Sequence, residues 1–468
     1  MNVASEWQQR GFSKRKMGPI PVIAIFDIGK TNKKLFLFDE NYHIVFERSA
    51  RIAEITDEDG YPCENLESLR LLVFDLLCEV FRMKEFVIRA INFSAYGASL
   101  VYIDEQGRPL APLYSYLKPY PRHLCKEFYS KYDGEERFSI QTASPASGSL
   151  NSGLQLYRLK QEHPGVFKQV KYALHLPQYL SYLLSGKVFS DMTSLGCHTG
   201  MWDFEQNRYH EWIQHEGIAL KLPPIAPTGK ISKPLFPGNN YKLGIGLHDS
   251  SAALIPYLVN FQVPFVLIST GTWCISLNPF NLLPLTTGEL KNNCLQYLQY
   301  KGKPVKASRL FSGFAHEQQE KRIAEYFNCD GGHFRNMVFD PQINDHLRSA
   351  IPQDINFADR NLSDFKNALF AYHQLNRDLV RLQVSSTCPV IKDTPVRRIF
   401  VDGGFSKNHV FMCLLAAAFP NFEVFAASMA QASAVGAALS IHRHWNTRPT
   451  PSDLIQLTYY SHGQDAFA

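Results

Sequence analysis

The stretch Leu243-Gly-Ile-Gly-Leu-His-Asp-Ser-Ser251 decides how the rest of the chain is interpreted. It places one carboxylate, Asp249, among small residues just after a Gly-x-Gly turn, and an apolar run follows from Ile255. A carboxylate in this setting suits a general base, because small neighbours let the backbone and a substrate approach closely. The same residues also fit a plain helix start, with Asp249 in an Asx turn or N-terminal cap. The motif alone leaves both interpretations open.

The composition is that of an ordinary globular protein. The chain has 468 residues, 45% of them hydrophobic, which predicts two or three domains with large cores. The net charge of +5 is mild and the basic residues are scattered, so we expect neither nucleic acid nor a membrane as a partner. No apolar run is long enough to span a bilayer and the N-terminus is polar, which predicts a cytoplasmic protein. Residues 1–18 are predicted to form a flexible tail.

The cysteines and histidines do not predict a metal site. The nine cysteines are odd in number and include no Cys-x-x-Cys pair, which indicates reduced thiols rather than a disulfide framework. His210-Glu211 and His316-Glu317 each lack a second histidine at the metalloprotease spacing. Metal binding through histidine is therefore not expected.

A hairpin is predicted near the N-terminus, with strands over 21–26 and 34–38 around the turn 27–32. Gly29-Lys30-Thr31 imitates the end of a Walker A motif, but a strand follows where that motif needs a helix. A Gly-containing turn can still hold phosphate through backbone N–H groups, while a carboxylate at the strand end holds Mg²⁺. The alternative is an ordinary hairpin with a polar turn. The residues concerned are Asp27, Gly29, Thr31 and Asn32.

A second polar segment, Ser94-Ala-Tyr-Gly-Ala-Ser99, ends the strand predicted over 87–93. Ligands of open α/β sheets lie beyond the carboxyl ends of strands, so polar side chains there can line a pocket. Alternatively, the tyrosines simply cap a core with their hydroxyls in water. The candidates for binding the hydroxyls of a small polar substrate are Tyr96, Ser99, Lys118 and Arg122.

The second half of the sequence contains a strand-turn-strand motif of the same kind as the first half. A strand-turn-strand is predicted over 266–277 around Ser269-Thr-Gly-Thr272, and a strand over 396–401 leads into Gly403-Gly404. Adjacent glycines between a strand and a helix let a flat ring lie against bare backbone, although a tight turn needs the same residues. Residues 426–441 are predicted as a helix of small residues that packs closely. Residues 223–237 indicate a linker or exposed loop, and 292–314 only a basic surface.

Together these motifs make the chain resemble the FGGY-type carbohydrate kinases of the actin and hexokinase superfamily. Phe26-Asp-Ile-Gly-Lys-Thr-Asn32 is similar to the first phosphate motif of that family, and Ile268-Ser-Thr-Gly-Thr-Trp273 to the second. Val401-Asp-Gly-Gly-Phe-Ser-Lys-Asn408 resembles the adenosine motif. Gly246-Leu-His-Asp-Ser250 resembles the catalytic segment, in the form seen in rhamnulose and fuculose kinases.

The resemblance implies an α/β fold of two ribonuclease H-like lobes, 19–243 and 244–468, with a nucleotide and sugar cleft between them. It implies a kinase that uses ATP and Mg²⁺ on a ketose such as L-rhamnulose or L-fuculose, or else on xylulose or gluconate. A homodimer is the assembly to test. Asp249 would be the base and Asp27 the residue that holds Mg²⁺. The implied ATP contacts are Asp27, Gly29, Lys30, Thr31, Asn32, Gly271, Thr272, Gly403, Gly404 and Asn408. The implied sugar contacts are Tyr96, Gly97, Ser99, His248, Asp249 and Ser250.

Two departures and two rival functions accompany this resemblance. Ser99 replaces an acid of the deoxyketose kinases, which leaves the sugar open, and Lys30 replaces a small residue, which suggests extra charge beside the phosphates. The same nucleotide cleft serves chaperone-type ATPases, and a catalytically silent sugar sensor would also keep the fold. Retention of both Asp27 and Asp249 favours the kinase.

Overall fold

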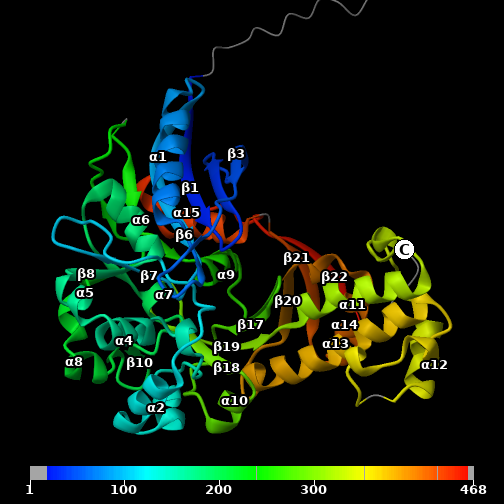
Figure 1. Cartoon of the computed structure of the whole chain (residues 1–468). Coiled ribbons are helices and arrows are strands. Elements are labelled where there is room, and N and C mark those ends of the chain that lie inside the picture. Colours follow the sequence, from blue (N-terminus) through cyan, green and yellow to red (C-terminus); the bar gives the residue numbers. More distant parts are fainter. Residues whose placement is uncertain (1–17, 239, 353, 430, 462–468) are drawn as a thin grey trace, which may run out of the picture.

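The computed structural model describes residues 18–238, 240–352, 354–429 and 431–461. These residues form two lobes, each built on a mixed β-sheet (Figure 1). Apart from Gly18, the predicted flexible tail lies outside the described residues and stays a prediction.

The first sheet has the strand order β13-β14-β6-β1-β2-β3, and β15 also pairs with β6. The predicted N-terminal hairpin is confirmed, because β1 (Ile20–Ile28) pairs with β2 (Lys33–Phe38) in antiparallel register. β6 (Phe86–Ala95) runs parallel to β1 on its other side. The remaining strands are β3 (Ile44–Ala50), β13 (Ile231–Ser232), β14 (Lys242–Gly244) and β15 (Leu247–His248). Residues 22–26 are buried on both faces of the sheet, which explains their continuous apolar run.

Helices cover the outer face of this sheet. α1 (Leu66–Arg82) and α6 (Leu176–Ser185) pack there, and Gly186 ends α6 in the left-handed conformation with φ 61°. A helical layer beside them buries Trp212 and Phe128 in an aromatic cluster. Its helices are α2 (Arg122–Lys131), α3 (Glu135–Gln141), α4 (Ser152–Glu162), α5 (Pro164–Gln169), α7 (Met192–Leu195) and α8 (Trp212–His215).

Short strands complete the first lobe. They are β4 (Ile55–Thr56), β5 (Pro62–Cys63), β7 (Leu100–Ile103), β8 (Tyr172–His175), β9 (Ser190–Asp191), β10 (Trp202–Asp203), β11 (Arg208–Tyr209) and β12 (Ile225–Ala226). The segment 223–237 contains β12 and β13, which pair with β9 and β14. It is therefore tied to this lobe along its length.

The second sheet has the order β18-β19-β17-β16-β20-β21-β22 and repeats the core of the first. A hairpin, β16 (Phe265–Thr270) with β17 (Cys274–Asn278), again lies beside a parallel strand, β20 (Arg398–Gly403). The other strands are β18 (Cys294–Leu298), β19 (Pro304–Leu310), β21 (Glu423–Ser428) and β22 (Gln456–Tyr460).

Two sequence expectations for this lobe were wrong in part. Residues 292–314 form β18 and β19 rather than only a basic surface, and Lys306 is 1% exposed with its Nζ 2.7 Å from Glu289. The helix predicted over 426–441 begins only at Ala432, since residues 426–428 end β21. Both errors come from strands that pair over long range, which local periodicity does not reveal.

Helices cover the outer face of the second sheet as well. α13 (Ala368–Ile391) and α14 (His409–Ala418) pack there, with α11 (Ser312–Phe327) against α13. The shorter helices are α10 (Thr287–Lys291) and α12 (Pro341–Ala350).

Two helices form a layer that joins the lobes. α9 (Asp249–Asn260) and α15 (Ala432–Ser440) pack on the inner face of the first sheet, and α9 also packs on the second. α15 comes from the end of the chain yet lies beside β1 (Figure 1). A Cβ on Gly436 would lie 1.9 Å from the Ala252 carbonyl oxygen, so the small residues permit the close packing that the sequence predicts.

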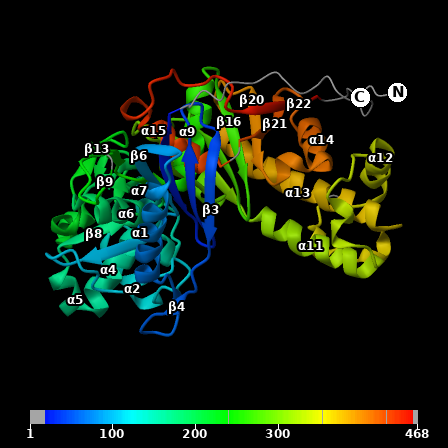
Figure 2. The same cartoon turned by 90° about the horizontal axis from the view of Figure 1, so that it is seen from above.

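The predicted boundary between the lobes, after residue 243, falls within the strands of the first sheet. Residues 243 and 244 lie within β14, β15 follows, and both strands pair with β6 of the first sheet. The division into 19–243 and 244–468 stays a prediction. Figure 2 shows the two lobes side by side with α9 and α15 between them.

Candidate active site

Sheet pairing brings Asp27 and Asp249 to the same region, although they are 222 positions apart in the sequence. β1 and β15 both run parallel to β6, and Asp27 and Leu247 are both register partners of Ser94. Asp249 follows β15 directly and begins α9. The three strands therefore end at the same edge of the sheet, where the sequence predicts a ligand.

Both carboxyl groups have raised pKa values. Desolvation by the surrounding protein raises the pKa of each to about 6, and the negative charge of Asp249 raises that of Asp27 further. The Asp249 side chain keeps 33% of its surface exposed, so solutes can reach it. A carboxylate with this pKa is a better proton acceptor than an ordinary aspartate, yet it is mostly ionised at neutral pH.

His248 orients the Asp249 carboxylate. Its Nε2 lies 3.2 Å from Asp249 Oδ1, and Asp249 Oδ1 also accepts a bond of 2.5 Å from the backbone N–H of Ser250. Burial lowers the pKa of His248 to about 4, so a neutral ring lies against the carboxylate, with its Nε2 also 3.2 Å from Cys197 Sγ. A Cβ on Gly97 would lie 3.0 Å from the imidazole, which explains why this position has no side chain.

Two other residues predicted to bind the sugar, Tyr96 and Lys118, have partners within the protein. The Tyr96 hydroxyl donates to Glu64 Oε2 at 3.3 Å. The Lys118 ammonium lies 2.6 Å from Asp57 and 2.8 Å from Asp59. Ser99 is 1% exposed, and its hydroxyl is buried without a hydrogen-bond partner among the described residues. Tyr96 and Lys118 are therefore not free donors, and Ser99 is not exposed to a solute. Their roles in sugar binding stay predictions.

The first phosphate turn is held by a buried lysine that sequence reasoning missed. Gly29 N–H donates to the Asn32 carbonyl at 2.9 Å, and Lys33 Nζ donates to the Lys30 carbonyl at 2.9 Å. Lys33 also forms an ion pair of 2.9 Å with Glu64, and both side chains are 2% exposed. No sequence signal separates Lys33 from an ordinary strand residue.

The side chains of this turn point toward solvent and nearby polar groups. Lys30 Nζ lies 2.6 Å from Glu54, and Asn32 Oδ1 accepts from Arg51 Nε at 3.1 Å, while Thr31 is exposed. The charge predicted at Lys30 is present but already paired with a carboxylate.

In the second lobe, the predicted phosphate and adenosine segments are adjacent. Thr270 and Gly403 are register partners, and a Cβ on Gly403 would lie 1.9 Å from the Thr270 carbonyl oxygen. Gly403 has φ +92°, a conformation that other residues rarely adopt. A Cβ on Gly404 would meet open space, so its bare backbone can accept a flat ring. Gly271 and Thr272 form the turn that follows β16.

Asn408 has a structural role at the start of α14. Its Oδ1 accepts from the Phe411 N–H at 3.0 Å, and its Nδ2 donates to Asn376 at 2.9 Å and to the Tyr372 hydroxyl at 3.0 Å. The side-chain amide is thus used within the protein, and the predicted contact with ATP stays untested.

The end of the chain contributes one residue that the sequence did not indicate. Ser433 at the start of α15 donates a bond of 2.9 Å to Asp27 Oδ2. The two residues are 406 positions apart, so only the fold shows that they meet. This bond fixes the carboxylate that is predicted to hold Mg²⁺.

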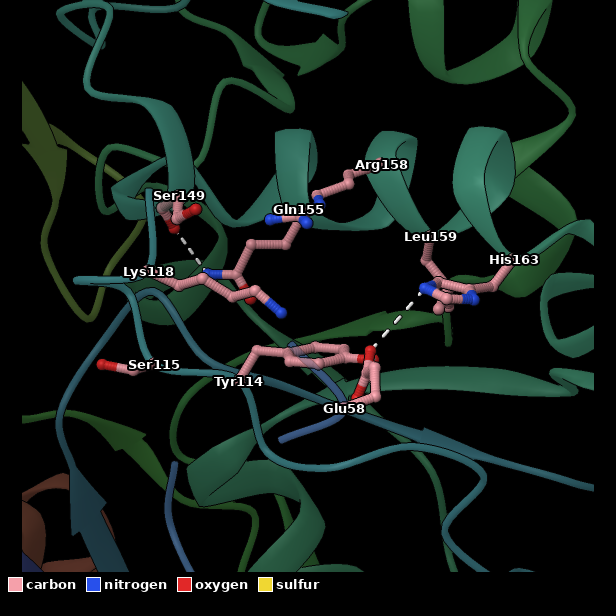
Figure 3. Close-up of a pocket in the computed structure, with 9 residues that line it drawn as sticks. All are labelled: Glu58, Tyr114, Ser115, Lys118, Ser149, Gln155, Arg158, Leu159 and His163. Atoms are coloured by element: carbon pink, nitrogen blue, oxygen red, sulfur yellow. Dashed lines mark hydrogen bonds and ion pairs between the residues drawn. The ribbon is translucent and has the colours of Figure 1, made fainter. Parts of the chain in front are cut away.

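A pocket adjoins the first phosphate turn. It has a volume of about 420 Å³ and shares Ser115 and Lys118 with a narrower cavity shown in Figure 3. Its lining comprises Lys30, Thr31, Arg51, Ile52, Glu54, Tyr61, Pro62, Ser115, Leu117 and Lys118. The pKa of Tyr116, in the same segment, is raised by burial and then by the charges of Asp249 and Glu54. Tyr116 therefore lies near both Asp249 and Glu54 of this pocket.

The narrower cavity suits water rather than sugar. Figure 3 shows Lys118, Gln155 and Tyr114 pointing toward one another within it. Its volume of about 20 Å³ is room for roughly one water molecule. Within the described residues, Gln155 Oε1 is buried without a hydrogen-bond partner, which a water there would supply.

The described residues contain no group of three or more His, Cys, Asp or Glu side chains placed to hold a metal ion. A single carboxylate such as Asp27 nevertheless fits Mg²⁺, which keeps water and phosphate oxygens as its other ligands. In the same ranges, no helix is both long and apolar enough to cross a bilayer.

Comparison with known proteins bears on the family and the fold. Residues 22–255 match the model of the N-terminal domain of the FGGY family of carbohydrate kinases. The chain is 24% identical over 269 residues to a rhamnulokinase of Halalkalibacterium halodurans and 25% identical over 300 residues to an L-fuculokinase of Salmonella typhi. These matches cover 53% and 60% of this chain. They span only 54% and 59% of the two relatives.

Solved structures confirm the predicted two-lobed fold over nearly the whole chain. A carbohydrate kinase from Novosphingobium aromaticivorans aligns with a TM-score of 0.76 at 22% identity, covering 94% of this chain and 96% of the other. A ligand-bound xylulose kinase from Lactobacillus acidophilus aligns with a TM-score of 0.77 at 16% identity, covering 94% of each chain.

Proposed function

Because the chain belongs to the FGGY family of carbohydrate kinases, we propose that it transfers the γ-phosphoryl group of ATP to a primary hydroxyl of an open-chain ketose. A 6-deoxyketose such as L-rhamnulose or L-fuculose is the first candidate, since the His248-Asp249 motif resembles kinases of those sugars and the relatives above carry those names. Xylulose or gluconate is the alternative, in line with the names of structural neighbours. A cytoplasmic location and a homodimer belong to the same proposal.

The observation that carries this proposal is the meeting of Asp27 and Asp249 at one sheet edge, at the junction of the lobes. Asp249 would accept the proton of the attacking hydroxyl, with its carboxylate oriented by the neutral His248 ring and the Ser250 N–H. Its raised pKa of about 6 suits this role at neutral pH. Phosphoryl transfer asks the protein mainly for positioning and neutralisation of charge, which this arrangement provides.

The ATP-binding residues divide between the lobes. Gly29, Lys30, Thr31 and Asn32 on one side, and Gly271 and Thr272 on the other, would bind the phosphates through backbone and side-chain donors. Gly403 and Gly404 would seat the adenosine against bare backbone, with Asn408 holding the start of α14 beside them. Asp27, fixed by Ser433, would hold Mg²⁺, which neutralises phosphate charge when bound.

Sugar-dependent release of ADP tests the proposal. We expect ADP release only when a ketose or related sugar is added, measured in a coupled assay over L-rhamnulose, L-fuculose, xylulose and gluconate. A chaperone-type ATPase would respond to unfolded peptide instead, and a sensor would bind sugar without turnover. Either result would refute the kinase proposal.

A further inference from the structure

Arg309 of β19 faces the layer between the two sheets. Side chains alternate along a strand, so Val305, Ala307 and Arg309 lie on one face of β19. Val305 and Ala307 pack in the same cluster as Leu254 and Tyr257 of α9. Arg309 therefore projects on the side of α9, whose first residue is Asp249. The opposite face of β19 contacts α13, as the bond from Ser386 to Ser308 shows.

Arg309 is half-buried, and its side chain has no partner among the residues that the structure describes. Its Nε is buried without a hydrogen-bond acceptor, and no described carboxylate lies within ion-pair distance of its guanidinium. A guanidinium nitrogen that is removed from water normally has an acidic or carbonyl partner, because desolvating an unpaired charge is costly. Two fully buried cations of the described residues follow that rule, since Lys33 pairs with Glu64 and Arg360 with Asp378. The missing partner points to a ligand.

The surroundings of Arg309 connect it with the catalytic aspartate. Tyr297 lies on the same sheet face, and its ring centroid is 5.9 Å from that of His248 and 6.1 Å from that of His198. Burial raises the pKa of Tyr297, the charge of Arg309 lowers it and the charge of Asp249 raises it. After burial, the same two charges act in opposite directions on the thiol of Cys197. Tyr297 and Cys197 thus lie close enough to both Arg309 and Asp249 to respond to the two charges.

We propose that Arg309 binds a carboxylate at the end of the substrate remote from the hydroxyl that Asp249 activates, so that the preferred acceptor is a sugar acid. This inference rests on the proposed function and favours its acid alternative over the neutral 6-deoxyketose. A guanidinium presents a planar fork that matches a carboxylate in two parallel hydrogen bonds. The neighbouring His198 and His248 are neutral, because burial lowers their pKa values to about 3 and about 4. A single guanidinium matches a monoanion better than a doubly charged phosphate.

The test compares acids with matched neutral sugars in the coupled assay. D-gluconate and D-glucitol differ only in the carboxylate, and L-rhamnulose, L-fuculose and xylulose complete the panel. We expect the wild-type chain to prefer the acid by at least about tenfold in kcat/KM. Arg309→Met should lower kcat/KM for the acid by at least about 100-fold, mostly through KM, and change that for the neutral sugars by less than about threefold. Arg309→Lys should fall between, since it keeps the charge without the fork.

Two controls separate recognition from stability. Lys303→Met removes an exposed cation from the turn of the same hairpin and should leave every rate unchanged. Stabilisation of the full chain by D-gluconate without ATP, measured as a shift in Tm, should occur in the wild type and vanish in Arg309→Met. If the variant does not fold, the Arg309→Lys rates and the wild-type preference still decide.

Each outcome is decisive. Phosphorylation of neutral ketoses at rates that Arg309→Met leaves unchanged, with gluconate inert, would overturn the role of Arg309 and leave the kinase proposal intact. Failure of every sugar to raise ADP release would overturn both.

Discussion

The two hairpins predicted to bind phosphate, β1–β2 and β16–β17, share a topology but differ in the residues that hold their turns. In the first, Asp27 is the last residue but one of β1, and side chains hold the turn, above all the buried Lys33–Glu64 pair. Around the turn of the second hairpin, glycines allow the backbone segments to pack closely: Gly403 lies against the Thr270 carbonyl and Gly313 against the Gly271 carbonyl. The first hairpin therefore offers charged side chains to a ligand, and the second offers backbone that a ligand can approach closely. A cleft that must hold both a charged phosphate chain and a flat ring needs both kinds.

The largest effect is expected for Asp249→Asn. The amide keeps the shape and loses the base, so kcat should fall by roughly 10²–10⁴-fold while ATP still binds. Steady-state kinetics and nucleotide titration measure the two quantities. Full activity in this variant would remove Asp249 from the mechanism. Loss of nucleotide binding as well would mean that it shapes the ATP site instead.

Lys33→Met tests the side-chain brace of the first hairpin. It leaves the Glu64 carboxylate buried and unpaired, so the free energy of unfolding should fall by roughly 3–5 kcal/mol. Denaturant unfolding measures this loss. The double variant Lys33→Met with Glu64→Gln should recover part of it, because no buried charge remains. Equal stability of the single variant and wild type would show that the ion pair does not hold the turn.

Gly403→Ala and Gly404→Ala test the glycine-built hairpin as a matched pair. Alanine at 403 must accept φ +92° and a contact of 1.9 Å with a carbonyl oxygen, so we expect a loss of about 2–3 kcal/mol in stability. Alanine at 404 meets open space and should leave Tm unchanged while weakening ATP binding, because its methyl group occupies the place of the ring. The idea of a bare-backbone seat fails if Gly404→Ala binds ATP as the wild type does.

Lys30→Ala should have the smallest effect. The Lys30–Glu54 pair is partly exposed, at 22% and 44%, and pairs of this kind contribute about 0–1 kcal/mol. We expect the free energy of unfolding to fall by no more than that amount, and KM for ATP to change by less than about threefold. A tenfold rise in KM would instead show that Lys30 leaves Glu54 for the phosphates when ATP binds.

The hairpins could be predicted because their signals are local. An apolar run, a Gly-containing turn and a second apolar run predict β1–β2 and β16–β17 from neighbouring residues alone. Gly403 and Gly404 were recognisable for the same reason. The strands β18 and β19 were missed because polar and basic residues, such as Lys306 and Gln296, occupy some of their buried positions. Because Tyr297 lies in β18 and Arg309 in β19, the sequence did not indicate either residue as part of the site.

By itself the sequence determined where the chain turns, which carboxylates stand at strand ends and where only glycine fits, because these follow from local sterics and period. Only the tertiary structure decided which polar groups are free. Tyr96 is bound to Glu64, and Asn408 to Asn376 and Tyr372, whereas Arg309 has no partner among the described residues. Hydrogen-bond partners are chosen across the whole fold, as Ser433 and Asp27 illustrate at 406 positions apart, and no local pattern encodes that choice.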